Sequence, residues 1–428
     1  MIYAQLARFL LPLMFIQVIQ EFSGQFLNGG MARVPQATQT LAAYGLAWAL
    51  AGFLTSTLTQ MHQVGLVLAT SHSARRKIQL FVVVGGALLG TLLLLLATTP
   101  FGVWVIEDLH GVGANLGGVV RHALFWLALA PILEGLIRLY SGLLLRLRRT
   151  EVLSYATAVS IAASIISVFV LLPAPFVQER PILLPVLVTY IGMLVNLGII
   201  LWGYRRYVKA CMEEGIRDDL GLAYLFHFSW PLALVMAIQG LSRPLINLFV
   251  ARGPNGTEAV AVLAVVYSLA NMGYGWVNDT RSLPPAFANT ANSLYAIRRF
   301  IGGCGLLSFL AMAILFWTPV RDHILAEWIG LQEGLVVQCR WPLVILTFFP
   351  LVVALRSYFH GVALIEHRTR ALVPSGPSRI GIIFVALLVF PWIGLYGATL
   401  GVAALLCGFV LEAVVVWWGV HSRRPRPQ

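Results

Sequence analysis

The sequence has little charge for its length. Only 11% of its 428 residues are Asp, Glu, Lys or Arg, whereas 59% are hydrophobic. A water-soluble domain could not cover its surface with so few charged side chains, so a soluble enzyme or binding protein is excluded. The composition instead predicts a chain that lies in a lipid bilayer, where a spanning helix needs about 20 apolar residues.

Cysteine and chemistry-bearing motifs are also scarce. The four cysteines, Cys211, Cys304, Cys339 and Cys407, have no paired spacing, which argues against a disulfide framework or a zinc knuckle. The sequence contains no phosphate-cradling loop, no His/Cys cluster and no nucleophile beside a base. We therefore expect no cofactor and no metal, and we predict that the protein is not an enzyme.

Twelve apolar runs lie between Pro, Gly and charged interruptions. They fall near residues 6–28, 37–68, 78–98, 119–145, 151–172, 181–207, 222–252, 257–280, 298–317, 336–365, 374–392 and 394–420. No cleavage site follows the first run, so we expect it to remain as span one. The predicted fold class is an all-α membrane protein with about twelve transmembrane helices.

The net charge of +12 would suit a nucleic-acid-binding protein, but the basic residues are placed otherwise. They cluster after the even-numbered spans, in Arg75–Lys77, Arg146–Arg149, Arg205–Arg217, Arg298–Arg299, Arg368–Arg370 and Arg423–Arg426. This alternation is the positive-inside bias, which predicts a multi-pass protein of the inner (plasma) membrane with both termini in the cytoplasm. We expect the lipid bilayer as a partner and no nucleic acid.

The two halves of the sequence share one plan. Leu11-Pro12-Leu13 recurs as Trp230-Pro231-Leu232, an offset of 231 minus 12, or 219 residues. The same offset pairs Gln20 with Gln239, Ser23 with Ser242, Asn28 with Asn247, Pro131 with Pro350, Gly142 with Gly361, and Arg149 with Arg368. We predict two pseudo-symmetric six-helix bundles, residues 1–207 and 221–428, which a cytoplasmic linker of residues 208–220 joins and between which a cleft lies.

Polar residues within the spans mark candidate sites, because they are costly in hydrocarbon. Helical spacing gathers such residues on one face of span one and of span seven: Gln20, Glu21 and Asn28, and then Gln239, Arg243 and Asn247. Arg243 either holds an anionic substrate by bidentate hydrogen bonds or pairs with a buried carboxylate. Glu21 either couples transport to a proton or sodium ion or has a structural role.

Later spans add further candidates. Glycines and prolines interrupt span eight beside Tyr274, Asn278 and Arg281, which makes this segment a candidate cavity wall. Arg356, with Ser357 and His360, forms a polar patch on span ten. Glu134 and Arg138 stand at i, i+4 and either neutralise each other or leave Glu134 as a second coupling site. Glu412 is an intramembrane carboxylate for which the sequence shows no partner.

Several segments together resemble the progressive ankylosis (ANKH) protein family, and the likeness covers nearly the whole chain. The matching residues are Ala43–Ala47, Val64–Val67, Ser229–Leu234, Gln239, Ser242–Pro244, Asn247–Val250, Glu258–Ala261, Tyr274–Trp276, Arg281, Pro285–Phe287, Arg356, Arg379 and Gly397–Val402. The resemblance implies a MATE-like fold of the multidrug, oligosaccharide-lipid and polysaccharide exporter superfamily. It also implies export of an anion such as citrate, ATP or pyrophosphate.

The predicted function is therefore a secondary transporter that exports a small organic or phosphate-bearing anion by alternating access. The residues expected to bind substrate are Arg243, Arg281, Arg356, Asn247, Gln239, Gln20, Asn28, Tyr274 and Asn278, with Glu21 and Glu134 expected to couple transport to an ion. Three alternatives stay open at this point: a cation-coupled multidrug exporter, a lipid-intermediate flippase, and a regulator that transports nothing.

Arg243 gives the first testable prediction. It corresponds to Gly24 in the repeat, so the first half leaves room where the second half places a cation. Replacing Arg243 with Lys keeps the charge but loses the planar fork, and we expect anion binding to weaken by about 1 to 2 kcal/mol. Arg243→Ala should nearly abolish flux into proteoliposomes while the protein still folds. Loss of folding would instead assign Arg243 a structural role.

Overall fold

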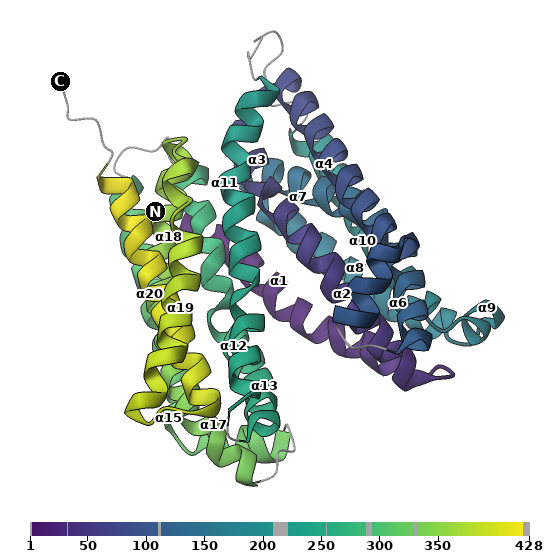
Figure 1. Cartoon of the computed structure of the whole chain (residues 1–428). Helices are drawn as coiled ribbons and strands as arrows, with labels where there is room; N and C mark the ends of the chain where they lie inside the picture. The colour runs from purple at the N-terminus through teal and green to yellow at the C-terminus, as the bar shows by residue number, and fades with distance from the viewer. Residues whose placement is uncertain are drawn as a thin grey trace. The chain divides into compact units, whose positions relative to one another are not determined.

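The computed structural model describes residues 2–31, 33–109, 113–208, 221–253, 255–287, 293–328 and 333–422. Almost all of these residues are helical, and the described part of the chain contains no β-strand (Figure 1). Helices satisfy every backbone donor and acceptor within one segment, which is the requirement that a hydrocarbon environment imposes.

Nine helical segments of the described chain are long and apolar enough to span a membrane, and a bent pair makes a tenth. The nine are Gln39–Leu68, His72–Thr98, Thr150–Leu171, Leu183–Val208, Leu222–Val250, Leu294–Trp317, Glu333–Ile365, Thr369–Ile393 and Gly397–His421. The pair is α6 (Ala114–Leu127) with α7 (Ala130–Arg146), bent by 44°. Helices α1 (Ile2–Met31) and α13 (Gly256–Tyr274) coincide with the other two predicted spans. The predicted all-α membrane fold is confirmed.

The chain forms two compact units. Residues Leu11–Ser229 make up one unit, and residues Met1–Leu10 with Trp230–Gln428 make up the other, so we call them the N unit and the C unit. The chain passes between the units inside α1 and inside α11 (Leu222–Gly240), next to the repeat-related Pro12 and Pro231. A proline within a helix removes one backbone hydrogen bond, so both helices are weakened at these points. The predicted linker, of which residues 209–220 lie outside the described chain, stays a prediction.

The N unit is built from the rest of α1 and the helices that follow it. These are α2 (Ala37–Thr55), η1 (Ser56–Gln60), α3 (Met61–Leu68), α4 (His72–Thr98), α5 (Pro100–Val103), η2 (Trp104–Leu109), α6, α7, α8 (Thr150–Leu171), α9 (Pro175–Glu179), α10 (Leu183–Gly203) and η3 (Tyr204–Val208). Its apolar core includes Leu93, Ile106, Leu124 and Leu127, none of which is exposed. Ser154 of α8 donates a hydrogen bond of 2.7 Å to the carbonyl of Pro12 and so ties α8 to α1.

The C unit repeats this order of elements. After α11 it contains α12 (Ser242–Ala251), α13, η5 (Gly275–Ser282), α14 (Leu283–Phe287), α15 (Ser293–Trp317), α16 (Val320–His323), η6 (Ile324–Trp328), α17 (Glu333–Leu346), α18 (Phe349–Ile365), η7 (Thr369–Leu372), α19 (Ser375–Val389), η8 (Phe390–Ile393) and α20 (Gly397–His421). In Figure 1, α18, α19 and α20 run beside one another, and α20 packs on both of the others.

Backbone features that are rare elsewhere recur at the 219-residue offset. The four non-glycine residues with positive φ in the described chain form two such pairs, Gln36 with Asn255 and Arg148 with His367. The 3₁₀ segments η1 and η5 begin at Ser56 and Gly275, again 219 residues apart by 275 minus 56. Because such conformations are uncommon for residues with a side chain, their recurrence supports the internal repeat that the sequence predicts.

Close helix crossings repeat in the same way. A Cβ on Gly142 would lie 2.1 Å from the carbonyl oxygen of His62, and a Cβ on Gly361 would lie 2.8 Å from that of Arg281. Both glycines and both carbonyls are related by the 219-residue offset. In the last helices the offset is shorter: Gly192 and Gly408 meet Ser164 and Ile383, so α10 and α20 are related by 408 minus 192, or 216 residues.

These crossings predict where a methyl group is not tolerated. Gly142→Ala or Gly361→Ala should destabilise the protein by about 1 to 3 kcal/mol, because the new Cβ meets rigid backbone of a neighbouring helix. The matched controls are Gly85→Ala in α4 and Gly381→Ala in α19, where nothing lies within 4 Å and the better helix propensity of alanine should apply. Thermal unfolding in detergent measures the difference. Equal melting temperatures for all four variants would contradict these crossings.

Candidate functional site

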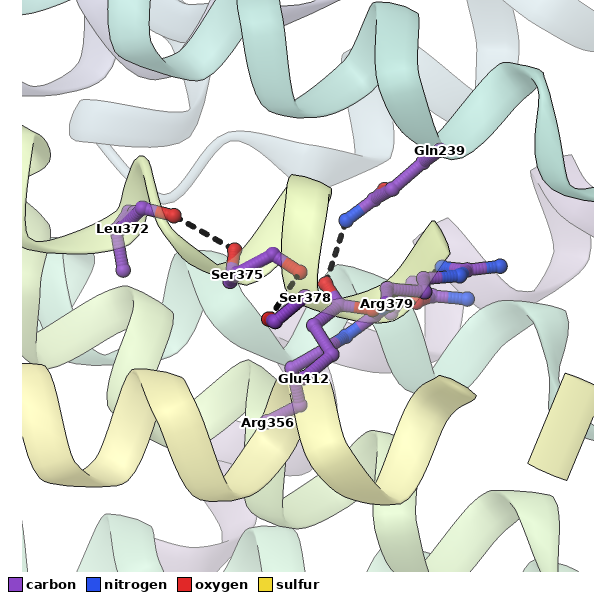
Figure 2. A network of polar contacts seen from close by, with 8 residues as sticks. Gln239, Arg356, Leu372, Ser375, Ser378, Arg379 and Glu412 are labelled. Atoms are coloured by element: carbon purple, nitrogen blue, oxygen red, sulfur yellow. Dashed lines mark hydrogen bonds and ion pairs between the residues drawn. The ribbon is translucent and has the colours of Figure 1, made fainter. Parts of the chain in front are cut away.

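A buried carboxylate gathers polar side chains of the C unit around it. Glu412 of α20 is 0% exposed, and its Oε2 accepts hydrogen bonds of 3.1 Å from Nη1 of both Arg356 (α18) and Arg379 (α19). Its Oε1 accepts a bond of 2.5 Å from Nε2 of Gln239, which approaches from α11 (Figure 2). The sequence showed no partner for Glu412 because its partners lie far away along the chain, where no helical spacing reveals them.

The two arginines also share one aromatic ring. The guanidinium carbon of Arg379 lies 4.0 Å from the ring centroid of Phe409, and that of Arg356 lies 5.0 Å from it. Such cation–π contacts favour the charged form of a guanidinium in a dry site. Arg356 further donates to the amide oxygen of Asn278, whereas the buried Nε of Arg379 donates to no acceptor among the described residues. We call Gln239, Asn278, Arg356, Arg379, Phe409 and Glu412 the arginine cluster.

The start of α19 positions Arg379. The hydroxyl of Ser375 donates to the carbonyl of Leu372 at 2.7 Å, and that of Ser378 donates to the carbonyl of Ser375 at 3.0 Å (Figure 2). Both serine hydroxyls thus donate to carbonyl groups at the start of α19, so neither donates to Glu412 in place of an arginine. A Cβ on Gly408 would lie 3.2 Å from Cγ of Arg379. The glycine therefore allows α19 and α20 to approach closely enough for the ion pair to form.

Arg243 lies near the arginine cluster but does not join its hydrogen bonds. Its guanidinium carbon is 4.9 Å from the ring centroid of Tyr267, and the residue is exposed. Tyr267 interacts electrostatically with both Arg243 and Arg379. The hydroxyl of Tyr267 and the amide oxygen of Asn247 are buried without a hydrogen-bond partner in the described part of the chain. Buried polar atoms in this state commonly indicate a missing water, ion or ligand.

The predicted break in span eight is present and supplies two members of the site. Helix α13 ends at Tyr274, and the chain continues as the 3₁₀ segment η5. The ring of Tyr274 is buried and packs against both Phe349 and Phe409, with centroid distances of 5.4 and 6.4 Å. Asn278 contacts Arg356, and Arg281 interacts electrostatically with His360. Because η5 is wound more tightly than an α-helix, Asn278 and Arg281 do not continue the α-helical face on which Tyr274 lies.

A separate cavity of about 550 Å³ lies within the N unit. Its wall includes Tyr44, Trp48, Thr157 and the pair Glu134–Arg138. Glu134 accepts a hydrogen bond of 2.6 Å from Nε of Arg138, so the predicted pairing is confirmed and the two charges offset each other. Whether Glu134 couples transport stays a prediction.

The repeat relates this cavity to the arginine cluster. At the 219- and 216-residue offsets Ser160 corresponds to Arg379 and Asn196 corresponds to Glu412. Both N-unit residues line the cavity, and Nδ2 of Asn196 donates to Oγ of Ser160 at 3.3 Å. The same place therefore holds a neutral hydrogen bond in the N unit and an ion pair in the C unit.

The structure thus brings together four of the predicted substrate-binding residues, Gln239, Tyr274, Asn278 and Arg356. Arg243 interacts with Tyr267 and Arg281 with His360, and each of these two neighbours also interacts with an arginine of the cluster. Asn247 is not among the residues that contact the cluster in the described part of the chain. The side chains of Gln20, Glu21 and Asn28 lie outside the described residues. Sequence reasoning missed Arg379, Phe409 and Glu412 as members of the site. The signal for Arg379 and Glu412 was the cost of placing charged side chains in long apolar helices, and Arg379 also belonged to the residues that resemble the ANKH family. Phe409 gave no signal, because a phenylalanine is ordinary in an apolar helix. Among the described residues, no group of His, Cys, Asp or Glu is arranged to hold a metal ion.

Comparison with known proteins decides the family. Residues 1–318 match the progressive ankylosis protein (ANKH) family. The chain belongs to this family. Arg356, Arg379 and Glu412 lie beyond the matched residues. Their arrangement in the arginine cluster is therefore known from the structure and not from the family match.

Solved structures of MATE transporters share the fold of this ANKH protein. A point mutant of the Vibrio cholerae transporter VcmN has a TM-score of 0.75 at 16% identity, covering 98% of this chain and 96% of that one. The eukaryotic transporter AtDTX14 has a TM-score of 0.69 at 15% identity, covering 97% and 94%. A MOP superfamily transporter from Pyrococcus furiosus, described as having a binding pocket of reverse polarity, has a TM-score of 0.70 at 15% identity, covering 98% and 95%. The MATE-like fold expected from the sequence is confirmed.

The arginine cluster predicts a specific stability effect. Glu412→Ala leaves two buried guanidinium groups without their carboxylate, and we expect a loss of about 3 to 5 kcal/mol. Glu151→Ala is the matched control, because Glu151 forms an exposed pair with Arg149 that should contribute less than about 1 kcal/mol. Thermal unfolding in detergent compares the two. A melting temperature of Glu412→Ala equal to that of the control would show that Glu412 does not bind the arginines.

Proposed function

We propose that this ANKH protein is a secondary transporter that exports a small organic or phosphate-bearing anion by alternating access, and that the C unit supplies the anion site. The observation that carries the proposal is the excess of cations around one buried carboxylate. Arg356 and Arg379 both bind Glu412, which leaves one positive charge uncompensated in the arginine cluster. An uncompensated charge in a dry site is costly, so binding of an anion there is favourable.

The surroundings of the cluster support an anion with several oxygens. Arg243 and Arg281 lie near it, and they bring the arginines to four against the carboxylates of Glu412 and of Asp279 in η5. Guanidinium groups match carboxylate and phosphate oxygens with paired hydrogen bonds. The unused Nε of Arg379 is a donor of this kind, and it is already in place. Citrate, ATP and pyrophosphate all carry the oxygens that such donors bind.

The alternatives receive less support. A cation-coupled exporter of cationic drugs needs a site of net negative charge, whereas Glu134 is offset by Arg138 and the arginine cluster is positive. A lipid flippase needs an opening between helices for an acyl chain, a requirement on which the charges of the arginine cluster do not bear. We therefore retain anion transport as the function that the chemistry of the described residues favours.

Flux measurements test the proposal. Proteoliposomes containing the protein should move labelled citrate, ATP or pyrophosphate, because the cluster binds their oxygens. Arg379→Gln removes a charge-assisted donor worth about 1.5 to 3 kcal/mol, so it should weaken anion binding about 10- to 100-fold. The variant keeps Arg356 as a partner for Glu412 and is expected to fold.

The matched control is Arg121→Gln, because Arg121 pairs with Glu107 within the N unit and takes no part in the arginine cluster. It should leave anion flux unchanged. The absence of flux for all three anions in folded wild-type protein, together with movement of a lipophilic cation or a fluorescent lipid, would replace the proposed function with one of the alternatives.

A further inference from the structure

The carboxylate that holds the arginine cluster together occupies one donor of each arginine that a substrate would use. Oε2 of Glu412 takes one N–H from each arginine at 3.1 Å, and its Oε1 takes the amide of Gln239. The described protein thus contains its own bound anion at the proposed site. A substrate that takes Nη1 of both arginines, in addition to the unused Nε of Arg379, displaces Glu412 from them.

A displaced Glu412 has nowhere favourable to put its charge. Its side chain is fully buried, and one turn away on the same helix the ring of Phe409 covers the arginines and packs on Phe349 at 5.0 Å. An ionised carboxylate left there, beside a newly bound anion and without a guanidinium, is strongly disfavoured. Uptake of one proton removes this penalty, because a neutral acid group tolerates an apolar site far better.

We propose that Glu412 is a proton-binding site linked to the anion site: it is ionised and paired with Arg356 and Arg379 when the site is empty, and protonated when an anion occupies them. This inference rests on the proposed function. One proton from the aqueous phase joins the carboxylate for each anion bound, and it leaves when the anion leaves. By linkage, protonation of Glu412 tightens anion binding, and anion binding tightens proton binding by the same factor.

Other ionisable groups face Glu412 and could share this role. The nearest titratable one is His360 of α18, which interacts electrostatically with Glu412, Arg356 and Arg281 and whose buried Nε2 has no hydrogen-bond partner among the described residues. Charging His360 would add a further cation beside two arginines that already carry charge, whereas protonation of Glu412 follows directly from the loss of its partners. Tyr274 of α13 also lies near Arg379. Arg356, Arg379 and Gln239 are the groups that contact Glu412 directly.

The internal repeat shows that the fold does not need an ionisable group at this place. Asn196, which corresponds to Glu412, cannot titrate near neutral pH, and it forms a hydrogen bond with Ser160 where Glu412 meets Arg379. The scaffold is thus stable with a neutral pair at this crossing. The ion pair in the C unit therefore places a carboxylate, which can bind a proton, at a crossing where the N unit has a neutral residue.

A proton that accompanies the anion changes what drives transport. If the two cross together, the carrier moves one negative charge fewer per cycle, and acidity on the side from which the anion leaves accelerates its movement. The inward proton gradient then opposes export. The outward gradient of the anion and the inside-negative membrane potential, which favours exit of the remaining negative charge, must drive it.

Proton uptake on binding tests the inference without any substitution. Wild-type protein in weakly buffered detergent solution receives citrate adjusted to the same pH, at a pH where citrate is fully ionised, and an indicator dye reports the protons taken up. We expect close to one proton per bound citrate. The dissociation constant of citrate should then rise up to tenfold for each unit of increasing pH. Binding without proton uptake, and with no dependence on pH, would overturn the proton site and leave the anion site standing.

Substitutions assign the proton to a residue. Glu412→Gln keeps an oxygen acceptor but cannot titrate, so it should bind citrate with no proton uptake and no pH dependence. It should also gain more thermal stability from citrate than wild type does, because its arginines lack a carboxylate. Should Glu412→Gln fail to fold, Glu412→Asp serves instead: it keeps the proton but shortens the reach, and we expect proton uptake with an altered pH dependence.

The remaining variants complete the assignment. Glu107→Gln, which removes a carboxylate paired with Arg121 in the N unit, should retain the proton uptake of wild type. Loss of uptake in His360→Gln, Glu21→Gln or Glu134→Gln, with uptake intact in Glu412→Gln, would overturn the assignment to Glu412. Wild-type protein that binds no anion at all would contradict the proposed function and, with it, the proton site.

Discussion

The cost of burying an ionised group without a partner governs the polar part of this protein. Glu412 lies on a helix of mostly apolar residues and is fully buried, yet its burial is tolerated because three donors from three other helices reach it. The constraint acts in both directions. Two buried guanidinium groups need a carboxylate as much as the carboxylate needs them, and one carboxylate offsets only one of them. The packing of α11, α18, α19 and α20 and the attraction for an anion therefore have the same origin.

Close helix packing is what allows the arginine cluster to form. Gly408 brings α20 against α19 beside Arg379, and Gly361 brings α18 against η5 beside Arg281. Related glycines, Gly192 and Gly142, make the same crossings in the N unit. Small residues at such crossings let backbones approach in a membrane, where the hydrophobic effect does not drive helices together. The polar residues of the C unit thus lie on helices that cross in the same way as the corresponding helices of the N unit.

The sequence predicted the framework better than the site. Long apolar runs and the recurrence of Pro12 as Pro231 are local or periodic signals, and they indicated the spans and the repeat. The break after Tyr274 was predicted from its glycines and prolines. The pairing of Glu412 with Arg356 and Arg379 was not, because these residues are 56 and 33 positions apart and no spacing rule links them. Glu134 and Arg138 were predicted as a pair because one helical turn separates them.

Divergence between the two units explains how one scaffold can hold a site in one half. In the N unit, Ser160 and Asn196 are small and neutral, and a cavity of about 550 Å³ lies beside them. At the equivalent positions of the C unit, Arg379 and Glu412 are large and charged, and Phe409 stands where the N unit has Met193. The C unit therefore places preorganised donors at positions that line a cavity in the N unit. Donors held in place by a carboxylate need no reordering to receive an anion, only the removal of that carboxylate, and neutralising it with a proton is the smallest chemical change that achieves this.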